Sequence, residues 1–233
     1  MNTQKSLGII TGLIFIGISI YLSFEFIEIN KNFVGRFGVG WVFSTILLRL
    51  LVCFSFGRGL QLILKALLPK LKGAFSFIIG FIIGFGVSFI SPIYAVDYGD
   101  YSDNEISLNT SDFNEITQNQ YSSETAPYLV CFFTTTCPHC KAACQLLGFM
   151  HAAGRMTKVV LIFPGEVANR EKFVAENDGL AFDAYSVSDK FFIENSGGVF
   201  PSIFLVNPDG SMNKHWYGGG LNYTALDYLA TFK

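Results

Sequence analysis

The sequence predicts two parts of different fold class: an all-α membrane region over residues 1–96 and an α/β domain over residues 106–233. Three observations predict this division. Long apolar runs occur only in the first part. Residues 1–96 hold eight of the sixteen Lys and Arg but two of the eighteen Asp and Glu, so the formal charge is +6 there and −8 in the rest. Beyond residue 106, short apolar runs alternate with helix-like segments and Gly- or Pro-containing turns.

Three apolar runs are candidates for membrane-spanning helices, near residues 7–24, 39–56 and 73–96. A helix needs about 20 apolar residues to cross the bilayer core. Arg49 interrupts the second run, and we expect it to snorkel or to pair with Glu25 or Glu28, because a charge within the bilayer is costly. The shorter run at 60–68 is expected to form a separate helix at the membrane surface.

Charge predicts the orientation of these spans. Basic residues cluster between the second and third runs, and Lys5 precedes the first run, so the positive-inside rule places both groups in the cytoplasm. Three spans then leave everything after residue 96 on the outer side. Lys31 and Arg36, in a predicted loop over residues 30–38, argue mildly against this orientation.

Two features of the last apolar run leave alternatives open. Gly80 and Gly84 form a GxxxG pattern, which is typical of helix packing and of pairing between two copies of a chain. Ile93-Tyr94-Ala95 resembles a signal-peptidase site, which leaves release of a soluble form as an alternative to a permanent anchor.

After an acidic linker at 97–105, five strands and four helices are expected. Continuous apolar runs at 128–134, 159–163 and 203–206 predict strands, typically buried on both faces. A short strand candidate at 106–108 and a hairpin partner at 212–217 complete the five. Cap and turn signals predict helices at 111–118, 138–153, 169–177 and 223–231. Ser111 or Asp112 is the expected cap of the first. The order β-α-β-α-β-α-β-β-α indicates a sheet with helices on both faces.

Three of the five cysteines lie in the stretch FFTTTCPHCKAAC, residues 132–144. Disulfide exchange needs one exposed thiolate to attack and a second thiol to resolve the mixed disulfide. A CxxC at the start of a helix supplies both, because the helix N-terminus favours negative charge on the first cysteine. We therefore predict Cys137 as the nucleophile and Cys140 as the resolving thiol. A protonated His139 would stabilise the Cys137 thiolate further, and Pro138 suits the first helical turn.

A buried strand, a CxxC at the mouth of a helix and an isolated Pro201 before a hairpin together resemble the thioredoxin-like family, over roughly residues 106–232. CPHC is similar to the active site of DsbA-type thiol oxidases. The order CFFTTTCPHCK … GGVFPSIFLVNPDG resembles thioredoxin domains that some bacteria fuse behind a DoxX/MauE-like membrane module. The resemblance implies a membrane-anchored thiol-disulfide oxidoreductase of the bacterial cytoplasmic membrane, with its α/β domain in the periplasm or outside the cell.

The resemblance also implies roles for single residues. Pro201 would be the cis-proline that lies against the CxxC, and the backbone of Phe200 would pair with an extended substrate segment. It implies no cofactor beyond a redox-active disulfide between Cys137 and Cys140. The expected partners are protein thiols and disulfides, a redox partner and the lipid bilayer; neither part has the basic, aromatic face of a nucleic-acid binder.

Two positions depart from the family pattern. A buried Asp or Glu usually stands on the strand before the motif, and here that position holds Cys131. An aromatic residue often precedes the first cysteine, and here it is Thr136. Both departures leave the direction of electron flow open between oxidase, isomerase and reductase.

The other cysteines and histidines allow different readings. Cys144 follows Cys140 by one helical turn; it is expected to be a small buried hydrophobe, with a third redox thiol or a metal ligand as alternatives. A metal-binding or metal-delivery module using Cys137, Cys140 and Cys144 is the alternative function, although zinc sites usually combine two separated ligand pairs. A third possibility is an interaction protein whose thiols are incidental. Cys131 is expected in the core, Cys53 facing lipid or a helix, and His151 and His215 at the surface.

Overall fold

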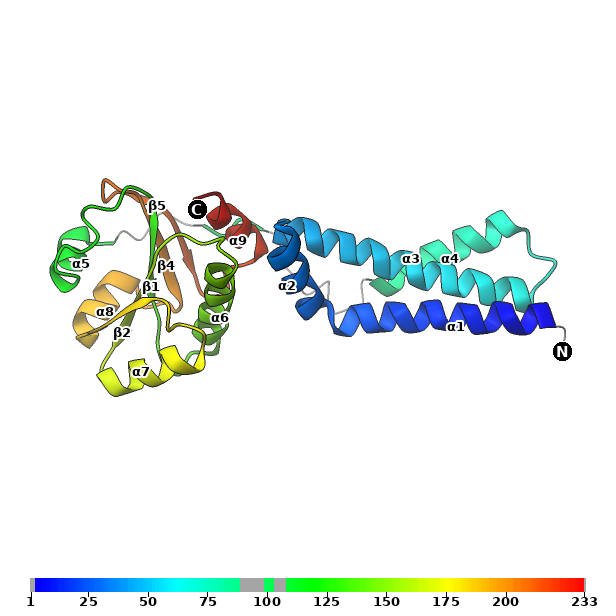
Figure 1. The fold of residues 1–233 in the computed structure, drawn as a ribbon, viewed down its shortest axis with the longest axis horizontal. Coiled ribbons are helices and arrows are strands. Elements are labelled where there is room, and N and C mark those ends of the chain that lie inside the picture. Colours follow the sequence, from blue (N-terminus) through cyan, green and yellow to red (C-terminus); the bar gives the residue numbers. More distant parts are fainter. Residues whose placement is uncertain (1–2, 89–98, 103–107, 233) are drawn as a thin grey trace. The chain divides into compact units, whose positions relative to one another are not determined.

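The computed structural model describes residues 3–88, 99–102 and 108–232. The chain divides into two compact units, Met1–Asp97 and Tyr98–Lys233. The described part of the first unit is entirely helical, and its helices are α1 (Thr3–Phe24), α2 (Phe26–Phe37), α3 (Trp41–Leu67) and α4 (Gly73–Ser88). Both α1 and α4 pack along α3 (Figure 1). The prediction of an all-α first part is therefore confirmed over these residues.

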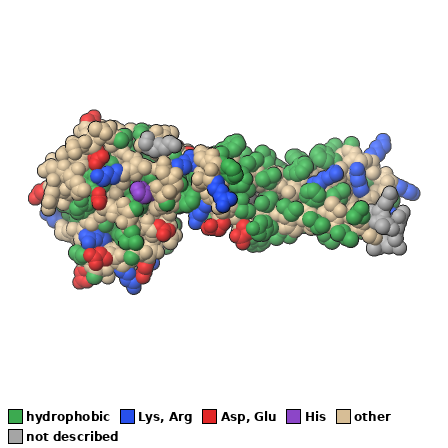
Figure 2. Space-filling view, in the orientation of Figure 1, with side chains coloured by type: hydrophobic (Ala, Val, Ile, Leu, Met, Phe, Trp, Pro, Cys, Tyr) green, Lys and Arg blue, Asp and Glu red, His purple; other side chains and the backbone are tan. Residues whose placement is uncertain are grey.

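Length and composition qualify two of the described helices to cross a membrane, namely Lys5–Phe24 and Trp41–Leu67. Helix α4 is apolar but has 16 residues. The rest of the third predicted span, residues 89–96, lies outside the described residues. Figure 2 shows hydrophobic side chains over much of the visible surface of this unit. Two of the three predicted spans thus meet the length requirement.

Two predictions for this unit are wrong. The run at 60–68 is not a separate surface helix, because α3 continues through it to Leu67. The segment 30–38 is not a loop, because residues up to Phe37 belong to α2, which buries Phe26, Asn30 and Val34 at helical spacing. Tertiary packing explains the first difference: the helix-weakening glycines of α3 lie where neighbouring helices approach, and packing overrides propensity there.

Glycines let the helix backbones of the first unit come into contact. A Cβ added to Gly84 would lie 2.6 Å from the carbonyl oxygen of Cys53, and one on Gly80 would lie 2.5 Å from that of Gly57. Both distances are far below van der Waals contact, so any larger residue requires the helices to separate. The GxxxG pair of α4 therefore packs against α3 of its own chain.

Several buried polar groups between these helices form hydrogen bonds across the helix contacts. The amide nitrogen of Asn30 donates to Thr45 Oγ1 at 2.8 Å, and that hydroxyl donates to the Trp41 carbonyl at 2.8 Å. Ser19 Oγ donates to the carbonyl oxygen of Val52 at 3.2 Å. Such bonds remove the cost of burying polar groups in an apolar bundle.

The second unit is an α/β fold around a five-stranded sheet in the order β3-β2-β1-β4-β5. Its strands are β1 (Tyr128–Phe132), β2 (Val159–Pro164), β3 (Asp183–Val187), β4 (Ser202–Val206) and β5 (Met212–Tyr217). The first three strands run parallel, whereas β4 is antiparallel to β1 and β5 is antiparallel to β4. The α/β fold class that the sequence predicts is therefore confirmed over the described residues of this unit.

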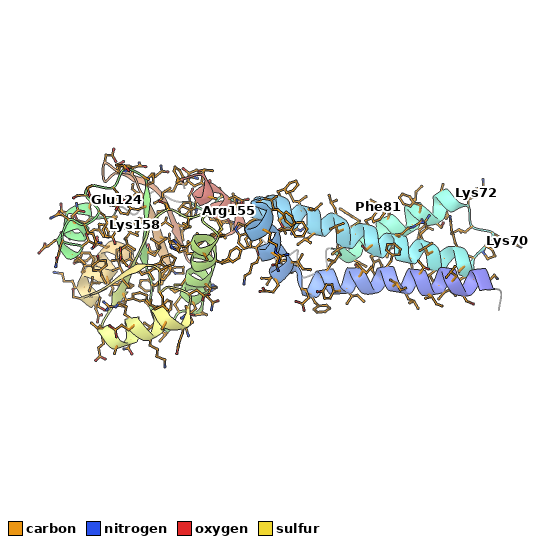
Figure 3. The ribbon with its side chains drawn as sticks, viewed as in Figure 1. Lys70, Lys72, Phe81, Glu124, Arg155 and Lys158 are labelled. Atoms are coloured by element: carbon orange, nitrogen blue, oxygen red, sulfur yellow. The ribbon has the colours of Figure 1, made fainter. Side chains whose placement is uncertain are left out.

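Helices cover both faces of the sheet (Figure 1). They are α5 (Thr110–Ile116), α6 (Pro138–Ala152), α7 (Val167–Glu176), α8 (Asp189–Ser196) and α9 (Tyr223–Leu229), followed by a 3-10 turn at Ala230–Phe232. One face buries a cluster in which Val130, Phe132, Ile162 and Phe204 of the strands meet Phe192 of α8. Where β1 and β2 begin, Lys158 pairs with Glu124 at 2.9 Å (Figure 3).

The sequence prediction differs from this unit at three places. The strand β3 and the helix α8 were not expected, because β3 is a half-buried edge strand without a continuous apolar run. The strand expected at 106–108 lies outside the described residues except for Leu108, which belongs to no strand. Helix α5 is capped by Asn109, not by Ser111 or Asp112, since Asn109 Oδ1 accepts the backbone N–H groups of both.

We predict that Gly84→Leu destabilises the first unit, because the new side chain would collide with the α3 backbone. Overpacking of this kind costs about 1–3 kcal/mol. The measurement is the apparent unfolding temperature of the full chain in detergent, followed by circular dichroism of its helices, and we expect a decrease of several degrees. Gly86→Leu on the same helix is the matched control, since a Cβ at Gly86 meets nothing within 4 Å. Equal unfolding temperatures for the two variants would contradict this packing.

Candidate active site

The sulfur of Cys137 caps the amino end of α6. Strand β1 ends at Phe132, and the chain enters the helix at Pro138, so Cys137 occupies the N-cap position. Its Sγ accepts the backbone N–H of Cys140 at a distance of 3.2 Å. Ser, Thr, Asp and Asn usually make this bond with a side-chain oxygen. Here a thiol makes it, and a thiolate would be stabilised by the same N–H and by the positive end of the helix dipole.

Cys140 lies one helical turn inward and is buried. Burial raises its pKa, and the neighbouring Cys137 sulfur raises it further. Hydrogen bonds with the backbone and the side chain of Thr134 act in the opposite direction. The two sulfurs of the motif therefore differ in environment. Cys137 is half-buried at the helix end, whereas Cys140 is buried. The raised pKa keeps Cys140 in its neutral thiol form.

A loop far away in the sequence completes this arrangement. The carbonyl oxygen of Phe200 lies 3.9 Å from Cys137 Sγ, and the Phe200–Pro201 peptide bond is cis, as the resemblance implies. The Phe200 ring stacks on Phe192 of α8 with 5.0 Å between centroids. The Pro201 carbonyl accepts the N–H of Gly218 at 2.8 Å. These contacts hold the loop against the start of α6.

The structure thus brings together Cys137, Cys140, Phe200 and Pro201, which the sequence predicts as site residues. Pro138 takes the first position of α6, and His139 follows it on the exposed side of the helix. Thr134 is a neighbour of Cys140 that sequence reasoning missed. Its position three residues before the motif, just beyond a buried strand, was the available signal.

Cys131 and Cys144 are both buried, as expected. Burial, and next the nearby Asp178, raise the pKa of Cys144 to about 12. The segment before β3 closes over this thiol, because a Cβ added to Gly179 would lie 3.1 Å from its sulfur. Cys144 therefore packs as a small hydrophobic residue. Among the described residues, no group of three His, Cys, Asp or Glu side chains is placed to hold one metal ion.

The surface prediction for His215 is wrong. This residue of β5 is fully buried, with its Nε2 2.7 Å from Ser202 Oγ and its ring stacked on Phe204 at 4.2 Å. An imidazole can be buried when a hydroxyl and an aromatic face surround it. Its role is to pack β5 against β4.

No family model and no curated protein matches the chain. Solved structures do. A secreted Mycobacterium tuberculosis disulfide oxidoreductase homologous to E. coli DsbE is 19% identical, with a TM-score of 0.41 over 47% of this chain and 84% of that one. The structure of MTB DsbF is 20% identical, with a TM-score of 0.41 over 47% of this chain and 82% of that one. StoA from Bacillus subtilis is 21% identical, with a TM-score of 0.36 over 46% and 83%.

All three identities are below 25% and all three TM-scores are below 0.5, so these matches carry no argument about the function of this chain. The DsbA-type and DoxX/MauE-like parts of the resemblance stay predictions, because no family model matches either part of the chain.

We predict that alkylation distinguishes the thiols of this unit. At pH 9 a Cys144 thiol with a pKa of about 12 is almost wholly protonated, and it is also buried, whereas Cys137 is half-buried at the helix end. Since the thiolate is the reactive form, Cys144 should react with iodoacetamide at least about 100-fold more slowly than Cys137. Mass spectrometry of each cysteine-containing peptide after timed alkylation of the reduced full chain measures both rates. Comparable rates for the two residues would contradict the burial of Cys144.

Proposed function

We propose that the chain is a thiol-disulfide oxidoreductase that exchanges electrons with protein thiols and disulfides through Cys137 and Cys140. The observation that carries the proposal is the bond from the Cys140 N–H to Cys137 Sγ at the start of α6. This bond and the helix end stabilise a leaving or attacking thiolate at Cys137. Cys140, buried one helical turn away, can attack Cys137 Sγ in a mixed disulfide and displace the substrate sulfur.

In the direction of substrate oxidation, the protein starts with a Cys137–Cys140 disulfide. A substrate thiolate attacks Cys137 Sγ, the bond between the two protein sulfurs breaks, and Cys140 leaves and takes up a proton. The second substrate thiolate then attacks the substrate sulfur of the mixed disulfide, and Cys137 leaves as a thiolate. The substrate has lost two electrons to the dithiol of the protein, and an external disulfide has to reoxidise it for another cycle.

Reduction of a substrate disulfide follows the same steps in reverse. The Cys137 thiolate attacks one substrate sulfur and releases the other. Cys140 then loses its proton and attacks Cys137, which restores the protein disulfide and frees the substrate dithiol. The backbone of Phe200, whose carbonyl oxygen lies 3.9 Å from the Cys137 sulfur, is where an extended substrate segment would pair.

We further propose that the first unit anchors the chain in a bacterial cytoplasmic membrane, with the α/β unit on the outer side. Its two long apolar helices and many exposed hydrophobic side chains support lipid contact. Lys70 and Lys72 lie in the turn between α3 and α4 (Figure 3), close in sequence to Lys65. Contact of Gly8 with Ala66 places the start of α1, with Lys5, beside the end of α3.

Lys5, Lys65, Lys70 and Lys72 therefore share one end of the bundle, which the positive-inside rule assigns to the cytoplasm. At the α2 end, Lys31 pairs with Glu28 at 3.1 Å. That pairing weakens the argument from Lys31 for the opposite orientation.

We predict that Cys137→Ala and Cys140→Ala each abolish turnover, with losses of at least about 100-fold, because each removes one of the two sulfurs that exchange. Cys144→Ala is the matched control on the same helix and should keep most of the activity. The assay is reduction of insulin disulfides, or oxidation of a peptide dithiol, by the full chain in detergent. In addition, Cys140→Ala should accumulate a mixed disulfide at Cys137, visible by mass spectrometry. Equal losses in all three variants would contradict the assignment of the pair.

We predict that a membrane-impermeant maleimide labels Cys137 in intact, briefly reduced cells. The α/β unit would face outward, whereas Cys53, buried in α3, should stay unlabelled before and after permeabilisation. Peptide mass spectrometry quantifies both sites. Labelling of Cys137 only after permeabilisation would place this unit in the cytoplasm and overturn the proposed location.

A further inference from the structure

Ser202 of β4 and His215 of β5 form a buried polar pair between these two strands. Neither side chain is exposed to solvent, and His215 Nε2 lies 2.7 Å from Ser202 Oγ. An imidazole nitrogen and a hydroxyl can share a hydrogen bond in either direction, so each of these two groups satisfies the other. The imidazole also stacks on Phe204, with 4.2 Å between ring centroids and 10° between the ring planes.

Apolar residues could fill the space of this pair with little change in stability. Folding exchanges hydrogen bonds to water for hydrogen bonds within the protein, so replacing both partners of a buried pair by apolar groups of the same shape is close to neutral. A hydrogen bond is directional, however, whereas apolar packing is not. The bond between Ser202 and His215 therefore fixes where the first residue of β4 lies relative to β5.

The start of β4 is also the end of the loop that meets the nucleophile. Ser202 directly follows Pro201. The carbonyl oxygen of Phe200, one residue earlier, lies 3.9 Å from Cys137 Sγ. The end of β5 holds this loop at a second point, because the N–H of Gly218 donates to the Pro201 carbonyl at 2.8 Å. One hydrogen bond through side chains and one through the backbone thus fix the loop from the side of β5.

Ser202 is also connected to the segment that carries the CxxC. In the sheet it pairs with Phe132, the last residue of β1, and the chain continues from there to Cys137. On its other side Ser202 pairs with Tyr217 of β5. A displacement of Ser202 would therefore move the Phe200 backbone relative to the sulfur of Cys137.

We propose that Ser202 and His215 are positioning residues for disulfide exchange. Their hydrogen bond holds the Phe200–Pro201 loop where an extended protein segment can pair with the Phe200 backbone while its own sulfur meets Cys137. Both roles rest on the proposed function, and both residues act through the loop, not on the reacting atoms. A small disulfide without a peptide backbone needs only the Cys137 sulfur, so its reaction should not depend on this pair.

The test compares two oxidants of the reduced full chain in detergent. One is a short peptide with an intramolecular disulfide, which becomes a dithiol. The other is dipyridyl disulfide, which has no peptide backbone and becomes two thiopyridone molecules. In both reactions Cys137 and Cys140 lose two electrons and become a disulfide. Acid quenching, alkylation and mass spectrometry of the segment with both cysteines give the two rates, and their ratio cancels any general loss of thiol reactivity or of folded protein.

In Ser202→Ala we expect the ratio of the peptide rate to the dipyridyl disulfide rate to fall about tenfold, a factor that one ordinary hydrogen bond can supply. His215→Phe keeps an aromatic ring against Phe204 but removes the nitrogen, and it should cause the same decrease. The double variant should be no worse than either single variant, because the effects of two residues that share one bond do not add.

Thr117→Val is the matched control. The buried Thr117 hydroxyl donates to the Phe113 carbonyl at 2.9 Å at the end of α5. This variant loses a comparable bond outside the loop and should keep the full ratio.

An unchanged ratio in Ser202→Ala and His215→Phe would overturn the positioning role, as would additive losses in the double variant or an equal decrease in Thr117→Val. In these cases the unsubstituted protein would still react with both oxidants, and the proposed function would stand. Failure of the unsubstituted protein to react with either oxidant would contradict the proposed function itself.

Discussion

The chemistry of the α/β unit depends on one hydrogen bond, from the Cys140 N–H to Cys137 Sγ at 3.2 Å. It makes a thiol the cap of a 15-residue helix and couples the folding of that helix to the placement of its reactive atom. The surrounding structure serves this contact. The fully buried strand β1 fixes where the chain leaves the sheet, and the Phe200–Pro201 loop, held by Phe192 and Gly218, closes over the sulfur from the other side.

The same contact explains how much of the site the sequence could predict. Spacing fixes Cys137, Pro138 and Cys140, because a CxxC at a helix start places its residues by local geometry alone. Pro201 and Phe200 could be placed only through a family resemblance, since they lie more than sixty residues away. The signal available for Thr134 was its position three residues before the motif, just beyond a buried strand. Helix α8, whose Phe192 stacks on Phe200, was missed because it has eight residues and follows an edge strand without a continuous apolar run.

In the first unit, the sequence predicted apolar helices but not how they would meet. The pattern of Gly80 and Gly84 indicates close helix packing, yet a pattern cannot tell which helix is the partner. The structure gives each glycine a backbone opposite it, at Gly57 and Cys53 of α3. The contacted part of α3 has two glycines of its own, Gly57 and Gly59, and the helix continues through them to Leu67. Propensity and packing conflict at these residues, and packing decides.

Cys131 of β1 lies near Cys140 and bears on the difference between the two sulfurs of the CxxC. Burial raises the pKa of Cys131 well above its ordinary value, so the position beneath the motif is neutral and brings no charge to Cys140. Burial opposes charge on the Cys140 sulfur, and this effect outweighs the hydrogen bonds of Thr134 that favour it. Charge on Cys137, in contrast, is stabilised by an N–H group and a helix end. Under the proposed function, Cys137 is therefore the sulfur that attacks and leaves as a thiolate, whereas Cys140 must lose a proton before it can attack.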